Sequence, residues 1–96
     1  MNTYVIRRKN NWKTPEDLEK AASRSARIGN EEMPDRVRWI RSYVVQEADG
    51  TLGTVCVYQG VDPGAIREHA ERAGMTADEV SPVVRTVLVR QDPKEG

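Results

Sequence analysis

The chain has one histidine, His69, and one cysteine, Cys56. These are the side chains that could bind a soft transition metal, and imidazole can also move a proton near neutral pH. One histidine cannot complete a metal site, so other ligands would come from Cys56, tyrosines, carboxylates, the backbone or a second subunit. The structural alternatives are a partly buried histidine on the flank of a helix and a cysteine that only fills space in a strand.

Two tyrosines and two arginines accompany Cys56 on one parity of the predicted strands. Tyr43 and Tyr58 share its face if the hairpin register holds, and Arg41 and Arg85 fall on the same parity. Arginines there would hold a ligand anion or an acid of a second subunit, unless they lie at an edge in water. We therefore predict a ligand pocket of Tyr43, Cys56, Tyr58, Arg41 and Arg85, with His69 and Cys56 as metal contacts.

Composition restricts the class of protein. The 96 residues are 38% hydrophobic and 31% charged, which suits one globular domain. Basic and acidic residues number 15 each, so the basic excess typical of nucleic-acid binding is missing. The sequence has no run of ~20 apolar residues for a membrane span and no signal-peptide pattern at its start. We expect a cytoplasmic protein without an internal disulfide, since there is one cysteine.

Local signals predict the order βαββαβ. Thr14 and Asp62 precede prolines and read as helix caps, while Gly29 and Gly74 read as helix stops. The expected elements are a strand over 4–6, a helix over 15–28, hairpin strands over 37–45 and 54–58, a helix over 63–73, a helical turn over 76–79 and a strand over 83–89. This pattern is typical of a single ferredoxin-like α+β domain over 1–96: a four-stranded antiparallel sheet with two helices on one face, and a frayed tail over 90–96.

The strands carry apolar residues on both parities, although two helices can cover only one face of a sheet. One parity holds Trp39, Tyr43, Cys56, Tyr58, Val87 and Val89, and the other holds Ile40, Val44, Val55, Val57, Val84 and Leu88. We predict a homodimer in which a second copy buries the uncovered face, assigned to Trp39 and Tyr43. The alternative is a monomer with aromatic residues on a half-exposed sheet.

Three segments together resemble a bacterial family of small proteins of unknown function. They are Trp39 to Val44, Cys56 to Tyr58, and Asp62 to Gly74 with its Ile-Arg-Glu-His-Ala sequence. The resemblance covers residues 3–89 and implies a ferredoxin-like dimer of the dimeric α/β-barrel type. Nickel binding is attributed to that family. The resemblance therefore favours His69 as a metal or ligand contact, with Cys56 and Tyr58 in the same pocket. The linker 29–35 and the hairpin turn 48–52 are longer here than in the family pattern.

Three functional hypotheses follow, and in the third the protein binds no small ligand. The first is a homodimeric binding protein that holds a divalent transition metal, with nickel suspected, or a small ligand in a cleft. The alternative, by fold analogy, is a cofactor-free enzyme of the monooxygenase or isomerase sort, with His69 or a tyrosine as acid/base group and Arg41 or Arg85 holding an anionic substrate. The third is an accessory dimer. No carboxylate pair, nucleophile–base pair or phosphate loop appears in the sequence, so a binding protein is favoured over an enzyme.

Overall fold

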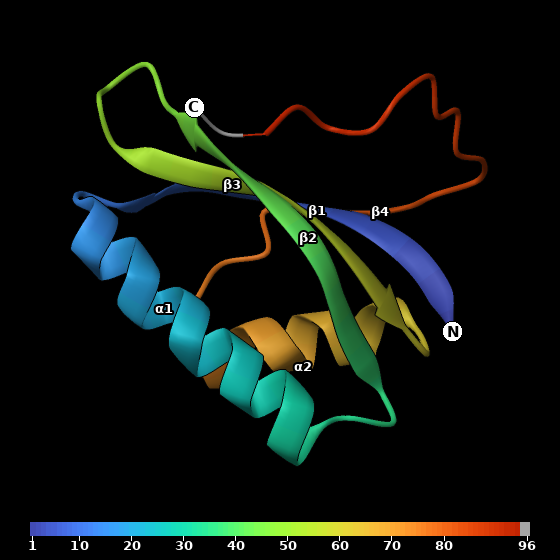
Figure 1. The fold of residues 1–96 in the computed structure, drawn as a ribbon. Helices are drawn as coiled ribbons and strands as arrows, with labels where there is room; N and C mark the ends of the chain where they lie inside the picture. Colours follow the sequence, from blue (N-terminus) through green and yellow to red (C-terminus); the bar gives the residue numbers. More distant parts are fainter. Residues whose placement is uncertain (95–96) are drawn as a thin grey trace.

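A computed structural model describes residues 1–94 and shows one four-stranded sheet with two helices beneath it (Figure 1). In chain order the elements are β1 (Asn2–Trp12), α1 (Pro15–Arg27), the π-helical segment η1 (Ile28–Glu32), β2 (Val37–Gln46), β3 (Leu52–Gly60), α2 (Pro63–Ala73) and β4 (Glu79–Pro82). The strands run antiparallel in the order β2-β3-β1-β4. This confirms the α+β, ferredoxin-like βαββαβ fold.

The helix starts follow from their capping residues. The Thr14 hydroxyl accepts the backbone N–H of Asp17, and the Asp62 carboxylate accepts that of Ala65. The proline that starts each helix has no N–H of its own that would need a partner. Gly74 ends α2 with φ +71°, in the left-handed region that glycine adopts without strain.

The predicted helix stop at Gly29 is wrong. The backbone continues from α1 into η1, which ends at Glu32, and Met33 N–H still reaches back to the carbonyl of Ile28. Ile28 and Met33 are both buried. Their burial holds this wider turn against the core, where sequence propensity alone favours an end at glycine.

β1 is much longer than the predicted strand over 4–6. Its pairing with β3 continues past Ile6 opposite Cys56 to Arg8 opposite Thr54. Backbone groups make this pairing, so polar side chains do not end it. Alternation along the strand then places Arg8 on the same face as Tyr4 and Ile6, toward the helices.

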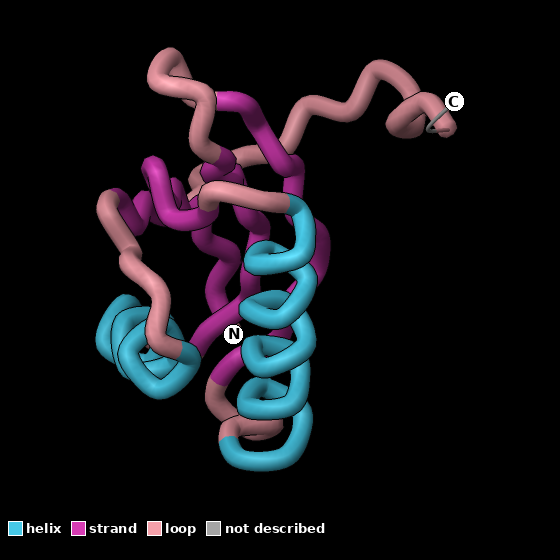
Figure 2. The backbone as a smooth tube through the Cα atoms, turned by 90° about the vertical axis from the view of Figure 1, so that its left-hand side faces the viewer, coloured by secondary structure: helices cyan, strands magenta, loops and turns pink. Residues whose placement is uncertain are grey.

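The predicted strand over 83–89 is wrong, and so is the helical turn over 76–79. The fourth strand is Glu79–Pro82, which pairs with β1 from Arg7 to Tyr4. Val83 N–H still donates to the carbonyl of Thr3, but β1 begins at Asn2 and offers almost no backbone beyond. The chain therefore leaves the sheet on the side away from the helices (Figure 2), where Val84 is 97% exposed. Within the predicted tail 90–96, residues 95–96 lie outside the described part.

A bulge in β2 overturns the predicted faces of the hairpin. Trp39 lies opposite Tyr58, but Arg41 lies opposite Val57, so Ile40 is an extra residue between them. Trp39 therefore stacks on Tyr58 on the helix side, with ring centroids 6.0 Å apart. Tyr43 falls on the outer face. The prediction that Trp39 and Tyr43 share the uncovered face, and that Tyr43 shares the face of Cys56, is wrong for this reason.

The core lies between the sheet and the two helices. It consists of Tyr4, Ile6, Ile28, Met33, Val37, Cys56, Tyr58, Ala65, Ile66 and Ala73. Small residues on the helices let them approach the sheet closely. No helix among the described residues is long and apolar enough to cross a membrane.

Candidate functional site

Four polar side chains meet inside this core, one from each of four elements. Arg8 comes from β1, Ser25 from α1, Tyr58 from β3 and His69 from α2, and each is at most 2% exposed. We call these four residues the buried polar cluster. Polar groups are rarely buried without a reason in a domain this small, because each must be matched by a partner.

The geometry of the buried polar cluster centres on Ser25. Its hydroxyl lies 3.0 Å from the hydroxyl of Tyr58 and 3.4 Å from Nε2 of His69. The rings of Tyr58 and His69 are tilted by 50° with centroids 5.3 Å apart, and the Arg8 guanidinium lies 5.8 Å from the Tyr58 ring centre. Ser25 is short enough to let α1 approach the sheet within hydrogen-bonding distance of Tyr58.

His69 is held in one tautomer. Its Nε2 lies 3.0 Å from the backbone carbonyl oxygen of Ser25. A carbonyl oxygen only accepts, so Nε2 carries the proton and Nδ1 keeps its lone pair. Nδ1 is buried and has no hydrogen-bond partner within residues 1–94. The sequence placed His69 on the flank of α2, whereas the structure buries it with Ile66 and Ala73.

Burial sets the protonation of this cluster. Desolvation lowers the pKa of His69, the hydrogen bond to the Ser25 carbonyl partly opposes it, and the positive charge of Arg8 adds a smaller lowering. Burial also raises the pKa of Tyr58, opposed by the Ser25 hydrogen bond and by Arg8. At neutral pH the cluster therefore contains a neutral imidazole, a neutral phenol and one guanidinium.

Arg8 carries the positive charge of the buried polar cluster. Its Nη1 donates to the carbonyl oxygen of Thr76 at 2.6 Å. Its Nη2 is buried and has no partner in the part of the chain that the structure describes. No described carboxylate forms an ion pair with Arg8.

Two cavities adjoin the buried polar cluster. The larger, of about 260 Å³, is lined by Arg8, Trp12, Leu18, Glu19, Ala22, Ser25, Trp39, Ser42, Val44, Thr54, Cys56, Tyr58 and Met75. The smaller, of about 110 Å³, is lined by Ser25, Ala26, Gly29, Asn30, Trp39, Tyr58 and His69. Ser25, Trp39 and Tyr58 line both cavities, so the two spaces are neighbours separated by these side chains.

The sequence profile of the family described as "Nickel responsive protein SCO4226-like" matches residues 4–83. The chain belongs to this family. It is a family of small bacterial proteins associated with nickel, and the match confirms the resemblance drawn from the sequence. The crystal structure of SCO4226 from Streptomyces coelicolor A3(2) superimposes with a TM-score of 0.69 at 22% identity, covering 88% of this chain and 99% of that one, which shows a shared fold. No curated protein is significantly similar to the chain.

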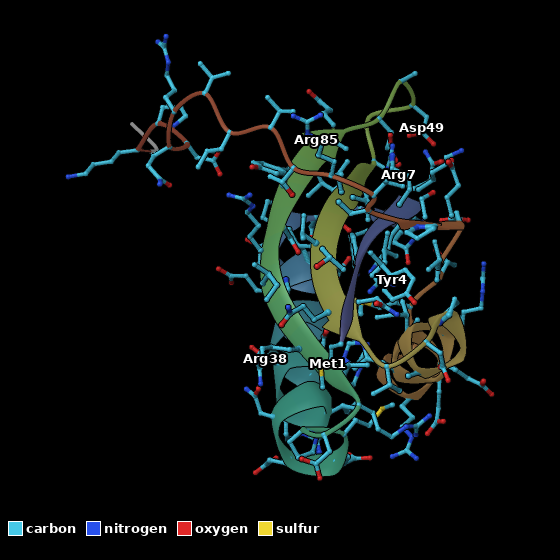
Figure 3. The ribbon with its side chains drawn as sticks, turned by 90° about the vertical axis from the view of Figure 1, so that its right-hand side faces the viewer. Met1, Tyr4, Arg7, Arg38, Asp49 and Arg85 are labelled. Atoms are coloured by element: carbon cyan, nitrogen blue, oxygen red, sulfur yellow. The ribbon has the colours of Figure 1, made fainter. Side chains whose placement is uncertain are left out.

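In this member of the SCO4226-like family, half of the predicted site residues come together. Cys56 lines the larger cavity, His69 lines the smaller one, and Tyr58 lines both. Tyr43 and Arg41 lie on the outer face instead, because of the bulge in β2, and both contact Asp92. Arg85 is exposed on the C-terminal segment, away from both helices (Figure 3).

The sequence reasoning missed Arg8, Ser25 and Trp39 as site residues. For Arg8 a signal was present: Tyr4, Ile6 and Arg8 alternate with period two, which is the spacing of one strand face. The polar run after Ile6 concealed it, because such a run usually marks a loop.

Nickel fits these residues only in part. The free lone pair of His69 Nδ1 is a suitable ligand. Cys56 donates from Sγ to the Thr54 hydroxyl at 3.2 Å and lines the other cavity. Among residues 1–94, no three His, Cys, Asp or Glu side chains lie close enough together to hold a metal ion. The described residues of one copy therefore do not form a complete set of nickel ligands.

Proposed function

We propose that this protein is a small metal-binding protein that holds a divalent transition metal, nickel first, with His69 as a ligand. The observation that carries the proposal is the fixed tautomer of His69. Its Nε2–H donates to the carbonyl of Ser25, and the lone pair of Nδ1 is left buried without a donor. Metal-binding histidines are usually held in this way, with one ring N–H on a backbone carbonyl and the other nitrogen on the metal.

The electrostatics of His69 also favour a metal. A histidine must be neutral to bind a metal, and burial lowers the pKa of His69, so protons compete less near neutral pH. A cavity of about 110 Å³ adjoins the His69 ring, with Gly29 beside Nε2. Cys56 lines the other cavity, so within one copy it does not lie beside an ion bound next to His69.

We propose further that the protein is a homodimer and that a second copy supplies the missing ligands. The described part of one chain offers no complete set of ligands, as shown above. Several large apolar residues are also exposed in the single chain: Ile40 at 49%, Val44 at 52%, Val87 at 77%, Leu88 at 60% and Val89 at 82%. So much exposed apolar surface on so small a domain supports burial by a partner.

The test of nickel binding is calorimetric titration of the tag-free protein and of His69→Gln. The glutamine amide can still donate toward the Ser25 carbonyl, but it has no nitrogen lone pair. We expect stoichiometric binding by the natural chain and a loss of at least about tenfold in affinity in His69→Gln, since even supporting residues of metal sites have effects of about 10- to 100-fold. Tyr43→Phe on the outer face is the matched control and should bind as the natural chain does.

Three outcomes would contradict these proposals. The metal proposal fails if no divalent ion binds, or if His69→Gln binds nickel as tightly as the natural chain. Light scattering at micromolar concentration, with and without nickel, tests the dimer separately. A monomer under both conditions removes the second copy as a source of ligands.

A further inference from the structure

We propose that the larger cavity is a binding site for a small organic acid, an apolar body with one carboxylate, which Arg8 holds in the core. This inference goes beyond metal binding by His69, because it rests on a different residue and a different cavity. It starts from the Nη2 group of Arg8, which is buried and without a partner among the described residues.

A comparison of Arg8 with its neighbour Arg7 shows how unusual a buried guanidinium without a carboxylate partner is. Arg7 points to the outer side, where its Nη2 donates to both carboxylate oxygens of Glu47 at 2.7 and 2.9 Å. Arg8 points into the core, where its guanidinium has the Thr76 carbonyl and the face of Tyr58 but no carboxylate within residues 1–94. A buried charge without a counter-charge is costly, and a bound anion would remove that cost.

The apolar residues that line the rest of the cavity indicate that most of the ligand is apolar. Trp12, Leu18, Ala22, Val44 and Met75 supply an apolar wall around the arginine. The volume of about 260 Å³ exceeds the ~150 Å³ of an engineered cavity that accepts benzene, so one aromatic ring system with a short acid side chain fits. A mostly apolar pocket with few, well-placed polar groups is typical of small-molecule sites.

Three polar side chains of the cavity wall, Arg8, Ser25 and Tyr58, suit a carboxylate. Arg8 offers a charged donor, and charged hydrogen bonds of this kind are shorter and stronger than neutral ones. Tyr58 and Ser25 share one hydrogen bond between their hydroxyls, 3.0 Å apart, so the remaining hydroxyl proton of the pair can turn to a ligand oxygen. The phenol stays protonated at neutral pH because burial raises the pKa of Tyr58.

Glu19 is the acid that also lines this cavity, and it is exposed on α1. Its carboxylate forms no ion pair with Arg8 in the described structure. The cavity therefore has a negative group at its exposed side and a positive group at depth. A carboxylate ligand would therefore enter with its acid group toward Arg8. The variant Glu19→Gln tests whether the Glu19 carboxylate, and not a ligand, forms the ion pair with Arg8 in solution.

The experiment compares an acid with its neutral analogue. Indole-3-acetate and indole-3-acetamide are titrated into the natural chain and followed by calorimetry. We expect the acid to bind about 10- to 100-fold more tightly, the ratio that follows from one charged hydrogen bond of ~1.5–3 kcal/mol. Arg8→Met should remove this preference and leave amide binding nearly unchanged. Loss of a purely structural arginine would weaken the acid and the amide alike.

Controls separate this site from others. Arg85→Met removes an exposed arginine and should bind both compounds as the natural chain does. Arg8→Lys keeps the positive charge and should keep a preference for the acid, which decides the matter if Arg8→Met does not fold. Glu19→Gln should bind the acid at least as tightly as the natural chain. Nickel binding, measured in parallel, should be unchanged in Arg8→Met and at least about tenfold weaker in His69→Gln, so the two proposals are tested separately.

The proposal is overturned if the natural chain binds neither compound, or binds both equally. It is also overturned if Arg8→Met weakens both compounds to the same degree. A tighter preference in Arg8→Met than in the natural chain would likewise exclude Arg8 as the carboxylate contact.

Discussion

The two faces of the sheet each place a tyrosine beside an arginine, with opposite results. On the outer face Tyr43 donates to Asp92 at 2.7 Å, and Arg41 lies 3.4 Å from the same carboxylate. On the inner face Tyr58 bonds a serine hydroxyl, and Arg8 has no carboxylate in the described residues. On the outer face Asp92 supplies the counter-charge, and water solvates the exposed polar groups. Inside, Nη2 of Arg8 has no hydrogen-bond partner among the described residues.

This difference distinguishes a surface from a site. Exposed arginines and tyrosines are stable in water whether or not a ligand comes, and an exposed ion pair contributes little. Buried ones lose their hydration, so an unpaired donor in the core is better explained by a ligand than by stability. The comparison can be tested by making the same change on both faces.

The largest expected effect comes from truncating the two tyrosines. Tyr58 is 1% exposed and contacts Trp39 and His69, so Tyr58→Ala should lower the free energy of unfolding by about 3–5 kcal/mol, as large core truncations do. Tyr43 is 42% exposed, and Tyr43→Ala should shift the urea midpoint only slightly. Urea denaturation measures both. Equal losses would show that the outer face is also covered, which in solution means by a second copy.

A smaller effect is expected in the pH dependence of the unfolding free energy, which differs between groups on the two faces. In the metal-free protein burial lowers the pKa of His69, whereas an unfolded histidine titrates near ~6.5. Between these two values the unfolded chain binds more protons than the folded one. The unfolding free energy should therefore fall as pH falls through ~6.5, and this loss should stop below the folded pKa of His69.

The outer partners titrate in another range, which provides the control. Hydrogen bonds from Arg7 lower the pKa of Glu47, so the contribution of this carboxylate is lost only as it protonates, below ~4.5. Urea denaturation with a chelator present at pH 7.5, 6.5 and 5.5 measures the inner effect alone. His69→Gln should flatten the profile over this range. An unchanged slope in that variant would assign the pH dependence to another group.

The two helix starts and the end of α2 were predictable because their signals are local. Thr14 and Asp62 with their prolines, and Gly74 with its positive φ, act within one turn of the backbone. The position of the fourth strand is not local. It depends on where β1 begins, and on long-range bonds that hold the chain after α2, such as Asp78 N–H to the carbonyl of Arg7. A β-branched run over 83–89 carries no information about either.

The candidate site was half predictable for a related reason. Cys56, Tyr58 and His69 could be chosen by residue type. Tyr43 and Arg41 were assigned to the wrong face because one bulged residue, Ile40, reverses the alternation after Trp39. Parity arguments hold along a strand only until the first bulge.

The smallest expected effect concerns the outer tyrosine and gives the most direct test of its surroundings. The hydrogen bond to Asp92 is the main cause that raises the pKa of Tyr43, with Arg41 opposing it. Asp92→Asn should therefore let Tyr43 ionise at lower pH, nearer the ordinary ~10, with little change in stability. The ultraviolet absorbance of tyrosinate follows this titration, and Tyr43→Phe identifies which of the three tyrosines responds.

The inner tyrosine is the internal reference in that titration. Burial, and not a carboxylate, is the main cause that raises the pKa of Tyr58, so its ionisation should be the same in Asp92→Asn as in the natural chain. A titration of Tyr43 that does not respond to Asp92→Asn would show that the segment after β4 does not hold Asp92 against the outer face in solution. The outer face would then be free of its own chain, and Arg41 and Tyr43 would both be available to a second copy.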